Sequence, residues 1–275
     1  MSMNSFHARQ GGRPRDEKPP KPAVDRHGLL RADALLVQLG LTASRTQAQR
    51  LISEGRVLLD GKPIAKPALE LPAAAALTVT ADDSDRYVSR GGLKLAGALA
   101  HTGIRVSGKR CLDIGQSTGG FSDCLLQADA ALVVGVDVGH GQLHPKLQNH
   151  PRILTLEGIN CRHLSATDLG YALPDQGFDL IVGDVSFISM SLILPQLPPL
   201  LSQVGDLLLL IKPQFEVGPS HIGKGGIVRD PGLYAALEMQ FREISKNLRL
   251  TVSAWLDSPI TGGDGNREFF IWLKP

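Results

Sequence analysis

The sequence predicts an α/β protein with a seven-stranded, mainly parallel sheet, preceded by a small α+β domain. From Lys109 onward, short apolar runs alternate with helical segments, which is the pattern of a parallel sheet covered on both faces. Near the carboxyl terminus, two apolar runs are joined by a loop alone, which predicts an antiparallel hairpin at one edge. Before residue 86 the pattern differs: two short helices precede a small sheet.

The 275 residues are enough for one medium domain and one small domain. The amino-terminal stretch is rich in Pro, Gly, Arg and Lys, so it cannot bury enough apolar surface to offset the entropy of ordering. In the small domain, one helix is expected to end at Gly40, and a second to be capped by Ser44 and to end at Gly55, before a strand, an Asp-Gly turn and a strand. The expected organisation is a disordered basic tail over 1–27, a small α+β domain over 28–85 and an α/β domain over 86–275.

The strands of the larger domain follow the apolar runs. They are predicted at 110–115, 131–137, 152–157, 178–185, 206–212, 250–256 and 268–273. Helices are expected between most of them, notably at 119–127, 190–203 and 231–247, with another beginning near Gly91. The last strand is expected to run against the others.

Composition is that of an ordinary globular protein, with 43% hydrophobic and 20% charged residues. The net charge is only +2, but residues 1–100 carry 15 Lys and Arg against 10 Asp and Glu, while residues 101–275 carry 14 against 17. A basic front on a mildly acidic body suggests contact with a polyanion. Solubilising surface charge is the alternative.

The three cysteines, Cys111, Cys124 and Cys161, show no C-x-x-C spacing, which favours reduced thiols and a cytoplasmic protein. The amino terminus has no apolar signal core, and the longest apolar runs have the length of strands. We therefore expect neither secretion nor a membrane span.

The loop DIGQSTGGFSD (113–123) follows the first predicted strand of the larger domain. It lacks the G-x-G-x-x-G of dinucleotide sites and has no lysine for phosphates, but it has glycines for close backbone approach and an acid at each end. Asp137 ends the next strand, where a carboxylate can accept both hydroxyls of a ribose. Taken alone, the pattern indicates a ligand-binding loop, and a structural turn or an NAD site stays open.

Taken together, the motifs resemble two known families. Ser44-Arg45-x-x-Ala48, followed by Gly55-x-Val57 and an Asp-Gly turn, resembles the S4 RNA-binding domain. The larger domain resembles the TlyA family of ribosomal RNA 2′-O-methyltransferases, which share an FtsJ-like catalytic domain of the class I (Rossmann-like) methyltransferase fold. The matching segments, in family order, are 87–95, 113–127, 136–143, 183–189, 211–218, 225–230, 258–260 and 265–270.

The resemblance implies S-adenosylmethionine as the cofactor. In such proteins a polar residue after the third strand often contacts the adenine, a position that Glu157 and Asn160 occupy, although a strand-end turn is the alternative for both. Gln116 departs from the small residue typical of the family and is expected to crowd the cofactor or alter its affinity. The implied cofactor-binding residues are Asp113, Gly115, Gln116, Ser117, Thr118, Gly119, Gly120, Phe121, Asp137, Val138, Glu157, Asn160 and Asp184.

FtsJ-like enzymes place Lys-Asp-Lys-Glu around the reacting hydroxyl, and the motif matches assign these roles to Lys94, Asp184, Lys212 and Glu268. Lys212 is expected to act as the base that takes the proton of a ribose 2′-hydroxyl. Lys94 would disfavour the protonated form of Lys212 by like-charge repulsion, while the two carboxylates position the amines. Ordinary strand-end charges are the alternative.

The expected partner is ribosomal RNA or a ribosomal subunit. Phe215 is available to stack on a base that has left its helix, with a place in the core as the alternative, while Phe187 is expected in the core. His140 and His144 lie four residues apart, but glycines interrupt the segment and the chemistry needs no metal, so none is expected. The residues expected to contact RNA are Arg45, Arg50, Arg56, Lys62, Lys66, Arg90 and Phe215.

These features predict an S-adenosylmethionine-dependent enzyme that methylates a ribose 2′-hydroxyl, by resemblance that of cytidine, in small- or large-subunit ribosomal RNA. One alternative is a non-catalytic RNA-binding protein with a degenerate methyltransferase domain, which only Gln116 supports. Another is a membrane-lytic haemolysin, a name given to family members, although no apolar span supports it. A dehydrogenase is disfavoured because G-x-G-x-x-G is absent.

Overall fold

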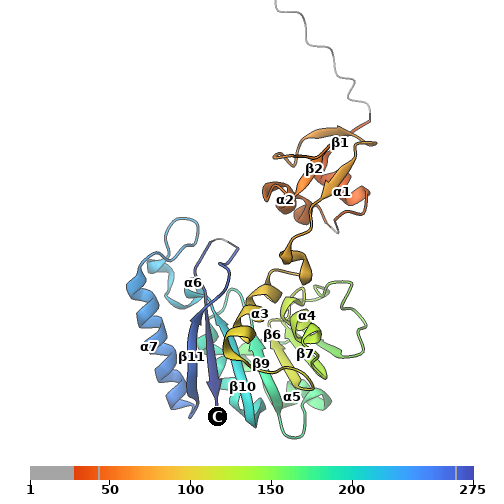
Figure 1. The fold of residues 1–275 in the computed structure, drawn as a ribbon. Coiled ribbons are helices and arrows are strands. Elements are labelled where there is room, and N and C mark those ends of the chain that lie inside the picture. Colours follow the sequence, from red (N-terminus) through yellow and green to blue (C-terminus); the bar gives the residue numbers. More distant parts are fainter. Residues whose placement is uncertain (1–27, 43, 264) are drawn as a thin grey trace, which may run out of the picture. The chain divides into compact units, whose positions relative to one another are not determined.

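The computed structural model describes residues 28–42, 44–263 and 265–275. The basic tail expected over 1–27 lies outside the described residues. The chain divides into two compact units, one ending at Ala81 and the other spanning Asp82–Pro275 (Figure 1). Each unit has its own hydrophobic core, and the border expected from the sequence lies four residues later.

The amino-terminal unit is a small α+β structure. Ser44 accepts a hydrogen bond from the backbone N–H of Gln47 at 3.2 Å, so it caps its helix as expected. Asp60 and Gly61 both have positive φ, as the expected tight hairpin turn requires. The described elements of this unit are β1 (Leu29–Arg31), α1 (Ala32–Gln38), α2 (Arg45–Ser53), β2 (Val57–Leu59), β3 (Lys62–Pro63), β4 (Glu70–Pro72) and β5 (Leu77–Val79).

The larger unit is built on a seven-stranded sheet of the order β11-β12-β10-β9-β6-β7-β8. The hairpin expected at one edge is confirmed, and β12 inserts between β10 and β11, antiparallel to both. The other neighbouring strands are parallel. The strands are β6 (Arg110–Ile114), β7 (Leu132–Asp137), β8 (Ile153–Glu157), β9 (Phe178–Gly183), β10 (Leu201–Ile211), β11 (Thr251–Asp257) and β12 (Phe269–Lys274).

Helices cover both faces of this sheet, and the alternation of β10 shows why. Leu208 and Leu210 belong to the core under α3 and α4, whereas Leu207 and Leu209 belong to the core on the other face, which contains α7 residues. Figure 1 shows α3 and α4 on one face of the sheet. The helices of this unit are α3 (Gly91–Thr102), α4 (Gly120–Gln127), α5 (Ala166–Leu169), α6 (Pro213–Glu216) and α7 (Pro231–Asn247).

The helix expected over 190–203 is wrong. Three 3₁₀ turns occupy Met190–Leu192, Leu194–Gln196 and Pro198–Leu200, and β10 then begins at Leu201. This segment contains three prolines, which lack the backbone N–H that an α-helix needs and clash with the preceding turn. The apolar spacing therefore predicted burial correctly, but not the α-helical conformation.

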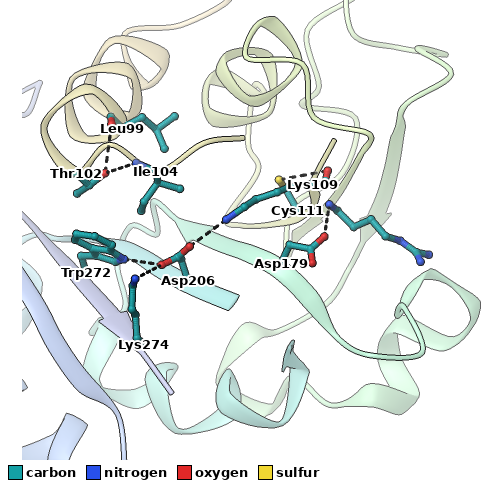
Figure 2. A network of polar contacts seen from close by, with 10 residues as sticks. Leu99, Thr102, Ile104, Lys109, Cys111, Asp179, Asp206, Trp272 and Lys274 are labelled. Carbon is teal, nitrogen blue, oxygen red and sulfur yellow. Dashed lines mark hydrogen bonds and ion pairs between the residues drawn. The ribbon is translucent and has the colours of Figure 1, made fainter. Parts of the chain in front are cut away.

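A polar network fastens the sheet at the end where the parallel strands begin (Figure 2). The Asp206 carboxylate lies 3.0 Å from Lys109 Nζ and accepts a hydrogen bond from Trp272 Nε1 at 2.9 Å. Lys274 Nζ lies 3.8 Å from the same carboxylate. The network joins β10, β12 and the residue before β6. At the opposite end of the sheet, where the parallel strands end, the chain continues into loops.

Candidate active site

Strand alternation directs three charged side chains towards α3. Core residues of β9, β10 and β12 pack under this helix, namely Val182, Leu210 and Phe270. Two positions along each strand, at one shared edge of the sheet, stand Asp184, Lys212 and Glu268. Because side chains two residues apart in a strand point to the same face, the three are presented to the helix that carries Lys94.

The four predicted catalytic side chains form two ion pairs. Lys94 Nζ lies 2.6 Å from Glu268 Oε2, and both side chains are buried. Lys212 Nζ lies 2.5 Å from Asp184 Oδ1 and donates a hydrogen bond to Ser186 Oγ at 2.8 Å. Buried charges are tolerated when they are paired in this way. Ser186 was not expected at the site, because nothing local distinguishes it from any loop serine.

The two pairs are neighbours in the sheet. Ile211 and Phe269 are the last partners in the ladder between β10 and β12, and the next residues along are Lys212 and Glu268. On the other side, a Cβ built on Gly91, one turn before Lys94, would lie 3.6 Å from Asp184 Oδ2. The quartet thus gathers where α3 meets three strand ends.

The glycine-containing loop after β6 is tied to the end of β7. Asp137 Oδ2 accepts a hydrogen bond from the backbone N–H of Ser117 at 2.7 Å, and its Oδ1 accepts one from Gly139 at 2.8 Å. Gly115 has φ +80°, and a Cβ there would lie 2.8 Å from the carbonyl oxygen of Asp184. Glycine is needed at 115 both for its conformation and for this close approach to the loop after β9.

Two adjoining cavities open beside this loop. The larger, of about 530 Å³, is lined by five of the predicted cofactor residues together with Asp184 and apolar side chains. The smaller, of about 140 Å³, is lined by further loop residues and by Lys212. Four lining residues are shared: Gly115, Ser117, Asp184 and Ser186. The predicted cofactor residues that line the larger cavity besides Asp184 are Gly115, Ser117, Asp137, Val138 and Asn160. Those that line only the smaller cavity are Gln116, Thr118, Gly120 and Phe121.

Gln116 does not fill the larger cavity. Its side chain is buried against Gly135 of β7, and its Nε2 donates to Ser122 Oγ at 2.8 Å. Ser122 Oγ in turn donates to Asp113 Oδ2 at 2.7 Å. The crowding expected from Gln116 is therefore not realised in the larger cavity, because the missing side chain at 135 leaves room beneath the loop.

Asp113 lies under the loop rather than in a cavity. Its side chain is wholly buried, and burial raises its pKa to about 7. It lines neither cavity, so the contact expected between its carboxylate and a cofactor ammonium group is corrected to support of the loop from below. Sequence spacing located the residue at the strand end, but could not show which way the side chain turns.

The space that Gln116 occupies yields a stability prediction. A Cβ at Gly135 would lie 2.0 Å from Gln116 Cδ, so Gly135→Ala is expected to lower the free energy of unfolding by about 1–3 kcal/mol through overpacking. Combining it with Gln116→Ala should recover part of that loss, with a coupling of about 0.5–3 kcal/mol. Urea denaturation of the two single variants and the double variant measures this. An equal cost of Gly135→Ala in both backgrounds would contradict the packing described.

The remaining residues predicted near the cofactor are placed as follows. Glu157 accepts a hydrogen bond from the backbone N–H of Gly141 at 2.7 Å and lies outside the larger cavity. Asn160 lines that cavity, while its Oδ1 accepts from the N–H of Arg162 at 3.0 Å. Gly119 precedes α4 with φ +89°. A Cβ there would lie 2.5 Å from Leu147, so this glycine also serves internal packing.

Two phenylalanines meet at the cavity rim. The expectation that Phe187 lies in the core is wrong: it is 92% exposed, lines the larger cavity and has φ +65°. Its ring centroid lies 5.5 Å from that of half-buried Phe215. An exposed aromatic residue in left-handed conformation has no sequence signature, because the conformation is imposed by neighbouring segments.

The basic side chains of the amino-terminal unit divide into two groups. Lys62 and Lys66 are exposed, and Arg50 is half-buried. Arg45 lies 3.2 Å from the wholly buried Asp33, whose pKa is held well below its usual range, mainly by the hydrogen bond from Arg31. Arg45 is thus both a surface cation and a partner of a buried carboxylate.

Arg56 is placed differently from expectation. Its side chain is buried, with 7% of the residue exposed, and Nη2 donates to the carbonyl oxygen of Thr80 at 2.7 Å. This arginine closes the small sheet rather than facing solvent, so its predicted phosphate contact is corrected. In the larger unit, half-buried Arg90 donates through Nη2 to the carbonyl oxygen of Thr261 at 3.2 Å.

Neither a membrane span nor a metal cluster is found in the described part of the chain. No helix there is both long and apolar enough to cross a bilayer. Nor do three or more His, Cys, Asp or Glu side chains gather there in a way that could hold a metal ion.

Each of the two units matches the model of a known protein family. Residues 87–275 match the model of the FtsJ-like methyltransferase family, and residues 30–74 match the S4 domain. The chain is 45% identical over 244 residues to the 16S/23S rRNA (cytidine-2′-O)-methyltransferase TlyA of Mycobacterium tuberculosis, covering 89% of each chain. It is 35% identical over 249 residues to Hemolysin A of Brachyspira hyodysenteriae, covering 87% of this chain and 98% of the relative.

A solved structure from Streptococcus thermophilus has the same architecture, with a TM-score of 0.70 at 38% identity, over 90% of this chain and 88% of the other. The family match spans the whole of the sheet and all four paired charges. The chain therefore belongs to the FtsJ-like methyltransferase family, and it carries an S4 domain ahead of its methyltransferase domain.

Proposed function

We propose that this methyltransferase uses S-adenosylmethionine to methylate a cytidine ribose 2′-hydroxyl in small- or large-subunit ribosomal RNA. The observation that carries the proposal is the convergence of Lys94, Asp184, Lys212 and Glu268 as two ion pairs at one edge of the sheet, with Asp184 and Lys212 lining its cavities. The name of the relative from Mycobacterium tuberculosis supports the nucleotide and the atom modified. Because the proposed substrate is ribosomal, we infer that the enzyme acts in the cytoplasm.

The larger cavity suits the cofactor. Its volume of about 530 Å³ lies within the range of roughly 300–1,000 Å³ usual for such ligands. We infer that Asp137, whose carboxylate is oriented by two backbone N–H groups, accepts the ribose hydroxyls of the cofactor. Val138 and Ile159, which line the cavity, would supply apolar walls for its base, and Asn160 would be available to the polar edge of that base.

The reaction needs a base and an oriented nucleophile. When bound, S-adenosylmethionine supplies a methyl carbon whose bond to sulfur breaks with the electron pair returning to sulfur. Lys212 takes the proton of the 2′-hydroxyl as the oxygen forms its bond to that carbon. Asp184 and Ser186, which line both cavities, hold Lys212 at the wall of the smaller one. The Lys94–Glu268 pair lies at the neighbouring strand end, where Glu268 precedes β12 beside Lys212.

The RNA would be held by two kinds of contact. Phe187 lines the larger cavity with its ring exposed and supported by Phe215, so an unstacked base can lie against it. The exposed cations of the S4 domain contact phosphates, which supplies affinity without sequence information.

Mapping methylated nucleosides in ribosomal RNA tests the proposed function. RNA from cells with and without the protein is digested and analysed by mass spectrometry. The expected result is a 2′-O-methylcytidine that disappears with the gene and returns when purified protein and S-adenosylmethionine are added to the unmodified RNA. An unchanged nucleoside profile, together with no calorimetric binding of S-adenosylmethionine, would support the non-catalytic alternative.

The S4 surface gives a separate prediction. Lys62→Ala combined with Lys66→Ala should weaken RNA binding and reduce the slope of log K against log salt by about one for each phosphate that the variant no longer neutralises. Both lysines are exposed, so folding should be unaffected. Filter binding at several salt concentrations measures the slope, with exposed Lys246→Ala in α7 as the matched control. An equal slope in all three proteins would remove these lysines from the interface.

A further inference from the structure

Glu216 ends α6, four residues after Lys212, and its carboxylate reaches the segment that follows β9. Oε1 accepts a hydrogen bond from the backbone N–H of Met190 at 2.7 Å, and Oε2 accepts a short one from Ser189 Oγ. Ser189 Oγ also lies 2.5 Å from Ser191 Oγ. Hydroxyl and backbone donors, rather than a lysine or an arginine, thus satisfy this carboxylate, and burial raises its pKa above its usual value.

The two segments that Glu216 joins carry the proposed reaction machinery. The first, residues 184–189, contains Asp184, Ser186 and Phe187; the second, residues 212–216, contains Lys212 and Phe215. The ladder between β9 and β10 ends at the pair Gly183 and Leu209. Beyond that pair, side-chain contacts set the separation of the two segments.

Those side-chain contacts lie between two places where the segments are held together. The last β9–β10 ladder pair joins the segments at one end, and the Glu216 carboxylate joins them at the other. Between them cross the Lys212–Asp184 ion pair, the Lys212–Ser186 hydrogen bond and the Phe187–Phe215 ring contact. Phe187 also adopts φ +65°, a conformation that persists only where neighbouring contacts hold it. Removing the Glu216 contacts would let both segments relax away from each other.

We propose that Glu216 is a positioning residue: by clamping the turn at Ser189 and Met190, it holds Asp184, Lys212 and Phe187 in the geometry that methyl transfer requires. The inference rests on the proposed function for its kinetic consequence, but the clamp itself is a property of the two segments. A mere stabilising cap on the 3₁₀ turn at Met190–Leu192 is the alternative.

The kinetic test compares Glu216→Ala with Glu216→Gln. The alanine variant should lose about 10- to 100-fold in kcat, because displacements near 1 Å cost rates of this order. The glutamine variant keeps an oxygen for the Met190 N–H, so it should recover most of the rate. Glu243→Ala, which removes an exposed carboxylate of α7, should be without effect. A wild-type kcat in Glu216→Ala would overturn the proposal.

A second readout does not depend on activity. Acetic anhydride labelling of Lys212, followed by mass spectrometry, should be several-fold faster in Glu216→Ala than in the wild type and unchanged in Glu243→Ala. Should the alanine variant fail to fold, Ser189→Ala removes one of the two clamp contacts and is expected to act in the same direction. Unchanged labelling of Lys212 in the folded variants would refute the clamp. If the variants are labelled faster but the wild-type protein itself has no methyltransferase activity, the proposed function alone is refuted.

Discussion

Lys212→Ala is expected to slow methyl transfer by about 10²- to 10⁴-fold while S-adenosylmethionine binding stays within about twofold of wild type. The Lys212 side chain lines the smaller cavity, held by Asp184 and Ser186, and its amine is the group proposed to take the proton of the hydroxyl. The Asp137 end of the larger cavity, proposed to hold the cofactor, does not involve this amine. Single-turnover assays with unmodified ribosomal RNA, and calorimetry with the cofactor, give the two quantities.

Lys212→Arg separates charge from proton transfer. Arginine keeps a positive charge that can pair with Asp184, but its guanidinium does not give up a proton in proteins. This variant should therefore be nearly as slow as Lys212→Ala. Lys146→Ala, at an exposed lysine after β7, is the matched control and should keep the wild-type rate. Turnover near the wild-type value in either Lys212 variant would remove this residue from the role of base.

Glu268→Ala is expected to lower the free energy of unfolding by about 3–5 kcal/mol and to abolish turnover. It leaves the buried ammonium of Lys94 without its partner at 2.6 Å, and a buried charge without a partner costs far more than an exposed one. Urea denaturation measures the loss of stability. Glu238→Ala in α7, which breaks the more exposed Glu238–Arg242 pair at 2.7 Å, should cost at most about 1 kcal/mol.

A double replacement distinguishes stability from chemistry at this pair. Lys94→Met combined with Glu268→Leu substitutes apolar side chains of similar size, which often restores the stability of a buried pair. We expect this variant to fold about as stably as the wild type and to remain inactive, because both charges are absent. Recovery of turnover would show that the pair serves folding alone, and an equal cost for Glu268→Ala and Glu238→Ala would contradict the burial described.

Much of the fold could be predicted because strands and hairpins depend on local patterns. The continuous leucine run of β10, the Ser44 cap and the Asp60-Gly61 turn each carry their own physical signal. The helix predicted over 190–203 is wrong because the prediction used the apolar spacing and ignored the three prolines, which cannot donate the backbone hydrogen bonds of an α-helix. The conformation of Phe187 could not be predicted, since contacts from a distant segment determine it.

The candidate site shows the same division. Lys94, Asp184, Lys212 and Glu268 could be named because motif order and strand ends place them at one edge. The directions of Asp113 and Arg56 could not, since each turns inward to a partner that is not visible locally: Ser122 for the carboxylate and the Thr80 carbonyl for the guanidinium. The space that the Gln116 side chain occupies likewise depends on Gly135, which lies nineteen residues later in the chain, in β7.

The Asp206 network has a practical consequence for engineering (Figure 2). It fastens β10 and β12 at the end of the sheet remote from the loops that would handle substrate. Substitutions meant to raise thermal stability can therefore be concentrated around Lys109, Trp272 and Lys274, where they are far from the loops proposed to carry out turnover. Libraries aimed at accepting other nucleosides belong at the opposite rim, at loop positions that take part in neither the two ion pairs nor the Glu216 contacts.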